Sequence, residues 1–129
     1  TRYSGWQAQP DRETVQGALA QAIRKVSGEA IVPQGSSRTD AGVHALDQVV
    51  AFKTTSRLAP DVWVRAINAW LPPDITVTAG DLAPDDFDPV SAPTAKRYRY
   101  RIHDAVPKPV LSRNFVWRWR GRWAWWRWT

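Results

Sequence analysis

Apolar residues recur at helical spacing in two separate stretches of the chain. The first stripe consists of Val15, Ala18, Leu19, Ala22, Ile23 and Val26. Thr14 is a suitable N-cap for this helix, and Gly28 is a suitable stop. The second stripe opens near Pro60, ends at Pro72-Pro73, and consists of Trp63, Ala66, Ile67, Trp70 and Leu71. The pattern predicts two amphipathic helices with these apolar residues, including both tryptophans, in the core.

Short apolar or alternating segments around the two helices predict strands. They are residues 30–32, 48–54 and 75–79, together with a first strand around Tyr3. The resulting order, β-α-β-β-α-β, predicts an α+β, ferredoxin-like (RNP-like) domain with both helices on one face of a sheet. The other face is then free for a partner, which is how RNA-recognition modules use a similar sheet. Because this fold carries many unrelated activities, the order alone does not predict a function.

The stretch 96–102 alternates strictly between basic and apolar side chains. It predicts a further strand with Tyr98, Tyr100 and Ile102 on one face and Arg97, Arg99 and Arg101 on the other. Pro107 and Pro109 then indicate a linker. Residues 114–129 hold six of the nine tryptophans, interleaved with arginines. Such a low-complexity run could stack on bases or lie at a membrane interface.

Charge is distributed unevenly along the chain. Residues 96–129 contain ten Lys and Arg against Asp104 alone, whereas residues 1–95 contain eight against eleven Asp and Glu. A basic segment favours a polyanionic partner, because neutralised phosphates release their counterions. A solvated basic tail is an equally good interpretation of the charge alone.

Composition excludes several classes of site. The chain has no cysteine, which rules out disulfides and thiolate metal sites, and two histidines argue against a histidine-rich metal site. No apolar run approaches the roughly 20 residues that span a bilayer, and the N-terminus lacks a signal-peptide pattern. We therefore expect no metal, no membrane and a cytoplasmic location.

Candidate chemistry lies in the loop between the second and third predicted strands, residues 35–44. Gly42 can take a positive φ in a tight turn. Arg38 and Asp40 lie two residues apart, so that in an extended segment their side chains leave on the same side. An adjacent arginine stabilises an ionised carboxylate, which can serve as nucleophile or base. From these residues alone, a structural ion pair between Arg38 and Asp40 is the favoured interpretation.

The stretch Ser37-Arg38-Thr39-Asp40-Ala41-Gly42-Val43-His44 resembles the signature loop of the TruA-type family of tRNA pseudouridine synthases, which usually reads Gly-Arg-Thr-Asp-Ala-Gly-Val-His. Further matches follow in order over about residues 3–117. They are Gly5-Trp6-Gln7 with Gln9, Thr14-Val15-Gln16, Gln48-Val49-Val50 with Phe52, Asn68-Ala69 with Leu71-Pro72 and Asp74-Ile75, and Ala95 with Arg97-Tyr98-Arg99-Tyr100 and Ile102.

The resemblance implies isomerisation of uridine to pseudouridine in the anticodon arm of tRNA (tRNA positions 38–40), without metal or organic cofactor. It implies tRNA as partner and a homodimer for full-length members. Asp40 matches the essential aspartate and Arg38 the arginine that pairs with it. Tyr98 matches the tyrosine that packs on the target base, and Arg97 and Arg99 are candidate substrate contacts. Without the resemblance, Tyr98 is better explained as a core aromatic.

Two departures from the family pattern, and the alternation of the arginine strand, affect these expectations. Ser37 replaces a glycine, which costs about 1 kcal/mol if the site needs a positive φ. Asp88-Pro89-Val90 replaces a His-Ala-Arg-like run. Strict alternation also places Arg97 and Arg99 opposite Tyr98, so either a bulge breaks the strand or some arginines form ion pairs away from the RNA.

The predicted organisation has three parts. Residues 1–104 form the catalytic N-terminal domain, 105–117 a linker and the start of a truncated second α+β domain, and 118–129 a Trp/Arg-rich tail of possible frameshift origin. The alternatives are a non-catalytic RNA-binding fragment of such an enzyme and a membrane-surface Trp/Arg peptide on an unrelated domain. His44 is expected to be a structural loop residue.

Overall fold

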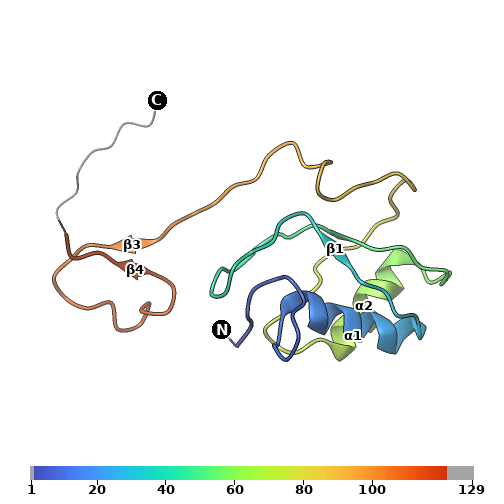
Figure 1. Cartoon of the computed structure of the whole chain (residues 1–129), viewed down its shortest axis with the longest axis horizontal. Coiled ribbons are helices and arrows are strands. Elements are labelled where there is room, and N and C mark those ends of the chain that lie inside the picture. Colours follow the sequence, from blue (N-terminus) through green and yellow to red (C-terminus); the bar gives the residue numbers. More distant parts are fainter. Residues whose placement is uncertain (1, 122–129) are drawn as a thin grey trace. The chain divides into compact units, whose positions relative to one another are not determined.

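The chain forms two compact units, residues 1–94 and 95–129, in a computed structural model that describes residues 2–121. The first unit contains α1 (Val15–Ser27), β1 (Gln34–Gly35), β2 (Val50–Ala51) and α2 (Pro60–Trp70), and the second contains β3 (Ile102–His103) and β4 (Trp117–Arg118) (Figure 1). The secondary structure is α+β, as predicted, with two helices and small sheets.

Helix α1 begins and ends where the sequence predicts. The Thr14 hydroxyl accepts a hydrogen bond from the Gly17 amide at 3.2 Å, which satisfies one of the unpaired N–H groups of the first turn. Gly28 ends the helix in the left-handed region, with φ 77°, and its amide donates to the Arg24 carbonyl at 2.8 Å. Local capping chemistry thus sets both ends of this helix.

Helix α2 packs against α1, and the two helices enclose the core of the first unit (Figure 1). Pro60 occupies the first turn, where its missing N–H leaves no bond unmade. The buried apolar residues of this core come from both helices and from the N-terminal segment: Trp6, Leu19, Ala22, Ile23, Trp63 and Ile67. Phe52 joins them edge-on to Trp63, with ring centroids 5.3 Å apart.

The prediction that Trp70 is a core residue is wrong. Trp63 is 8% exposed, as expected, but Trp70 is 58% exposed. Trp70 is the last residue of α2. Its ring is instead covered from one side by the Lys25 ammonium, 5.6 Å from the centroid, in a cation–π contact.

Strand pairing in the first unit is much shorter than the sequence predicts. β1 and β2 are antiparallel and pair Gln34 with Ala51 and Gly35 with Val50. No strand is assigned at residues 30–32 or 75–79, or around Tyr3, within the described part of the chain. The pairing of β1 with β2 starts at Gln34, two residues after Val32. Val32 is 74% exposed, so it is not a buried strand residue.

Side chains, rather than ladders, hold two of these segments in place. The Asn68 amide of α2 donates to the Val77 carbonyl and accepts from the Val77 amide, both at 2.8 Å, and so substitutes for a strand partner. The buried Tyr3 donates its hydroxyl to Asp74 at 2.7 Å. Burial, followed by this hydrogen bond, raises the pKa of Tyr3.

Glu29 ties the end of α1 to the segment after β2. Its carboxylate accepts the Thr55 amide at 3.0 Å, the Thr55 hydroxyl at 2.6 Å and the Thr54 hydroxyl. The Thr54 hydroxyl, followed by the two Thr55 donors, lowers the pKa of Glu29 to about 2 from its ordinary 4.5.

The change Glu29→Gln should therefore lower stability at neutral pH and matter less in acid. A carboxyl group whose pKa is lower in the folded state stabilises the fold above its unfolded pKa, and this contribution disappears as the pH falls from about 4.5 to about 2. Chemical denaturation at pH 7 and at pH 3 should show a gap between the parent and Glu29→Gln that narrows at pH 3. The exposed Asp85→Asn is the control, and a gap independent of pH would contradict this role for Glu29.

In the second unit, β3 and β4 pair in parallel, Ile102 with Trp117 and His103 with Arg118. The Trp117 amide donates to the Arg101 carbonyl at 2.7 Å and the Trp119 amide to the His103 carbonyl at 2.9 Å. The predicted strand over 96–102 is therefore restricted to its last residue, and residues 96–101 lie outside any assigned strand. The prediction for the tail beyond Gly121 falls outside the described residues.

Candidate functional site

The loop between β1 and β2, residues 36–49, contains the signature stretch, residues 37–44 (Figure 1). The Ser36 amide donates to the Val49 carbonyl at 2.9 Å, which continues the β1–β2 pairing by one step into the loop. Gly35 packs against the Trp6 indole so closely that a Cβ there would lie 2.7 Å from the ring. A larger residue at position 35 would therefore push the base of the loop away from the core.

The N-terminal segment holds the middle of this loop. The Trp6 amide donates to the Thr39 carbonyl at 2.9 Å. Gly5 has φ 89°, and a Cβ on it would lie 2.5 Å from the Thr39 carbonyl oxygen and 3.1 Å from the Asp40 carbonyl carbon. The two backbones are thus in direct contact, and only glycine permits the approach. Gly5 thus helps to position the Asp40 backbone, although it lies 35 residues earlier in the sequence.

A tight turn follows at Asp40. The Val43 amide donates to the Asp40 carbonyl at 3.1 Å, and Gly42 takes φ 83°, the left-handed conformation expected from the sequence. The turn leaves the Asp40 side chain exposed. His44, just beyond it, is also exposed. The loop therefore fixes the Asp40 main chain and presents its carboxylate to the solvent.

Arg38 and Asp40 share the loop but do not form an ion pair. The three ion pairs among the described residues are Arg2–Glu13, Arg2–Asp74 and Arg65–Asp61. Both Arg38 and Asp40 are exposed, and the tight turn of the loop begins at Asp40 itself. Water screens an exposed pair, so the attraction is too weak to hold two mobile side chains together.

Ser37 carries no backbone strain. Asp11 is the one non-glycine residue with a positive φ in the described part of the chain, so Ser37 lies in an ordinary region. The cost expected from replacing glycine at this position does not arise. Ser37 instead uses its carbonyl as an acceptor for the Gln48 side chain, at 2.5 Å.

Gln48 was matched to the family pattern in the sequence but received no role. Its Nε2 donates to the Ser37 carbonyl, and its Oε1 accepts from the Ser36 hydroxyl at 3.2 Å. The side chain thus bridges the two ends of the loop from just before β2. A polar residue at the start of an otherwise apolar strand was the only signal for this role.

Gln48→Ala should loosen the loop without unfolding the unit. Loss of two part-buried hydrogen bonds is expected to cost about 1–2 kcal/mol of unfolding free energy. Hydrogen exchange should speed up at the amides of residues 36–40 more than elsewhere. Gln7→Ala, which removes an exposed glutamine, provides the control. Equal exchange at residues 36–40 in both variants would contradict the bridging role.

Tyr98, Arg97 and Arg99 lie in the second unit, where all three are exposed. Tyr98 is 64% exposed, which contradicts the alternative of a core aromatic. None of the ion pairs formed by the described residues involves Arg97, Arg99 or Arg101. These side chains are therefore available to an external partner, and the ion-pair alternative for the alternating arginines is not supported.

The segment Asp88-Pro89-Val90, which departs from the family pattern, has a structural role in the first unit. Asp88 accepts the Val90 amide at 3.0 Å and the Ser91 hydroxyl at 2.8 Å, while Pro89 is fully buried. The Val90 amide, followed by the Ser91 hydroxyl, lowers the pKa of Asp88. The segment is thus a capped turn anchored by proline.

Two negative findings apply to residues 2–121. No group of three or more histidine, cysteine and acidic side chains is arranged to hold a metal ion. Neither described helix has the length and apolar character needed to cross a membrane.

Comparison with known proteins identifies the family. The profile of the tRNA pseudouridine synthase family matches residues 1–107. The chain is 42% identical over 116 residues to tRNA pseudouridine synthase A of Caldicellulosiruptor bescii, covering 90% of this chain and 48% of the relative. It is 41% identical over 121 residues to tRNA pseudouridine synthase A of Geotalea uraniireducens, covering 94% of this chain and 50% of the relative. The chain thus spans about half the length of these relatives, and with its signature loop inside the matched region it belongs to the tRNA pseudouridine synthase family.

Proposed function

We propose that the full-length protein isomerises uridine to pseudouridine in the anticodon arm of tRNA, with Asp40 as the catalytic carboxylate. The observation that carries this proposal is the loop itself. It fixes the Asp40 backbone through Thr39 and the Val43 amide, yet leaves the carboxylate exposed. No ion pair or side-chain hydrogen bond within residues 2–121 occupies that carboxylate. An exposed, uncommitted carboxylate on a fixed main chain can act as nucleophile or base.

The reaction explains why such a group is needed. The bond between C1′ of the ribose and N1 of uracil breaks, the base turns, and a new bond joins C1′ to C5. The hydrogen on C5 leaves as a proton, and N1 gains one, so that no oxidant or reductant is required. A carboxylate can stabilise the ribose after the base departs or remove a proton. Both roles require that the carboxylate be accessible to the substrate.

The remaining site residues have roles in binding. Arg38, two residues before Asp40, is proposed to pair with Asp40 or with an RNA phosphate once water is displaced, because an ion pair strengthens when it is desolvated. Tyr98 is proposed to stack on the target base, replacing part of the stacking lost when the base leaves the helix. Arg97 and Arg99 are proposed to contact phosphates.

The family also suggests the larger organisation. We propose that residues 1–104 form a catalytic ferredoxin-like domain, that 105–117 lead into a second α+β domain, and that the full-length protein is a cytoplasmic homodimer. The order of α1, β1, β2 and α2, with one segment around Tyr3 before α1 and another at 75–79 after α2, is compatible with the β-α-β-β-α-β arrangement. Side-chain anchoring by Asn68 places residue 77 beside α2, as a fourth strand requires.

The proposal is tested by mapping pseudouridine in an unmodified tRNA transcript after incubation with the full-length protein. Product is expected in the anticodon arm and should disappear when the uridines of that arm are replaced by cytidine. A transcript with the same replacement in another arm is the control and should still be modified. Product outside the anticodon arm would refute the proposed target. If the protein binds the transcript but no pseudouridine forms, the non-catalytic RNA-binding alternative replaces the proposed function.

A further inference from the structure

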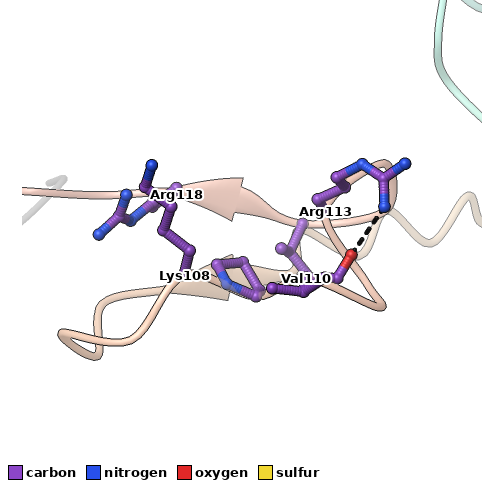
Figure 2. Close-up of a pocket in the computed structure, with 6 residues that line it drawn as sticks. Lys108, Val110, Arg113 and Arg118 are labelled. Atoms are coloured by element: carbon purple, nitrogen blue, oxygen red, sulfur yellow. Dashed lines mark hydrogen bonds between the residues drawn. The ribbon is translucent and has the colours of Figure 1, made fainter.

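The second unit contains a surface hollow of about 310 Å³ whose charged lining is entirely basic. It is lined by Lys108, Pro109, Val110, Arg113, Val116 and Arg118 (Figure 2). No carboxylate lines it, and none of its three cations belongs to an ion pair formed within residues 2–121. Three positive charges therefore lie together in this hollow, and no carboxylate of the described residues neutralises them.

The two arginines are oriented by the main chain. Arg113 donates through Nη1 to the Val110 carbonyl at 2.9 Å, and Arg118 donates through Nη2 to the Val106 carbonyl at 3.2 Å. Figure 2 shows Arg113 turned back onto Val110, while Lys108 and Arg118 extend toward the other end of the hollow. Each guanidinium group therefore uses one donor to fix its position and keeps others for a ligand.

Arg118 also has an enclosed donor. Its Nε is buried and has no hydrogen-bond partner among the described residues. An external phosphate would therefore bind the outer nitrogens of this guanidinium group, through charge-assisted bonds. The planar guanidinium group suits phosphate geometry, and Lys108 adds a point charge. The apolar residues Pro109, Val110 and Val116 leave a surface on which a ribose can rest.

We propose that this hollow, which belongs to the second unit, is a phosphate-binding site for an RNA strand, whereas the loop that carries Asp40 belongs to the first unit. RNA is favoured over a small anion because the cations extend beyond the hollow: residues 95–121 contain eight Lys and Arg against Asp104 alone. This inference depends on the proposed function in one respect: it takes RNA to be the polyanion that binds.

The test measures the affinity of this chain for an unmodified tRNA transcript at several salt concentrations. The hollow variant is Lys108→Gln with Arg113→Gln and Arg118→Gln. The control is Arg12→Gln with Arg24→Gln and Arg57→Gln, which removes the same charge from the first unit. The hollow variant should bind at least about tenfold more weakly, with a salt dependence shallower by about 2 in the log–log slope. The control should change affinity by less than about threefold.

Two further variants guard against a folding artefact. Lys108 makes no hydrogen bond or ion pair recorded within the described residues, so Lys108→Gln removes charge without removing a structural contact. It should weaken binding and reduce the slope by about 0.7–0.9. The double change Arg113→Lys with Arg118→Lys keeps the charge of the hollow, and this variant should retain most of the parent's affinity for tRNA. Equal losses in the hollow and control variants, or an unchanged Lys108→Gln, would overturn the proposal. Because no pseudouridine is measured, failure of the Asp40 assignment would leave this result unaffected.

Discussion

Gly5→Ala should destabilise the protein by roughly 2–4 kcal/mol and displace the loop that carries Asp40. The added methyl group would lie 2.5 Å from the Thr39 carbonyl oxygen and 3.2 Å from the Ala41 amide nitrogen. These are backbone atoms, which cannot rotate away as a side chain could. The positive φ of 89° adds the conformational cost that a side chain brings to this region.

Gly28→Ala separates the two costs. Gly28 also has a positive φ, 77°, but nothing lies within 4 Å of the added methyl group. This variant should lose only about 1 kcal/mol, and its loop should be unchanged. Chemical denaturation measures the stabilities, and hydrogen exchange at residues 37–43 measures the loop. If both alanine variants lose the same stability and Gly5→Ala leaves the loop amides protected, the contact between Gly5 and Thr39 does not position Asp40.

The helices could be predicted from the sequence because their determinants are local. Thr14, Gly28 and Pro60 each act within one turn of the residues they cap, and the apolar stripes identified the facing sides. The failure at Trp70 shows the limit of this reasoning. Periodicity reports which face of a helix a residue occupies, but it does not report whether a neighbouring segment covers the residue at the end of that face.

Strands and the loop contacts were harder to predict because their partners are distant in sequence. Tyr3 bonds Asp74 across 71 residues, and Asn68 replaces a ladder partner for Val77, neither of which a local pattern contains. The family resemblance identified Gly5 and Gln48 as matching positions but said nothing of what they touch. Their contacts with the loop arise only from the tertiary fold. The expected Arg38–Asp40 pair depended on a local attraction between two side chains that both prove to be exposed, where water weakens it.

Asp40→Asn should abolish isomerisation while leaving the fold and tRNA binding intact. Asparagine has nearly the same size and shape but cannot act as a carboxylate nucleophile or base. The loop should be retained, because it is held through the Asp40 carbonyl and the Thr39 carbonyl and not through the Asp40 side chain. Loss of an essential group of this kind is expected to lower turnover by at least about a thousandfold.

The most direct measurement is the release of tritium from tRNA labelled at C5 of uridine, because bond formation at C5 must expel that hydrogen. In the full-length protein, Asp40→Asn should release tritium at least about a thousandfold more slowly, with tRNA affinity within about threefold of the parent. Asp47→Asn, which removes another exposed carboxylate of the same loop, should retain full activity. If Asp40→Asn releases tritium at the parental rate, Asp40 is not the catalytic carboxylate.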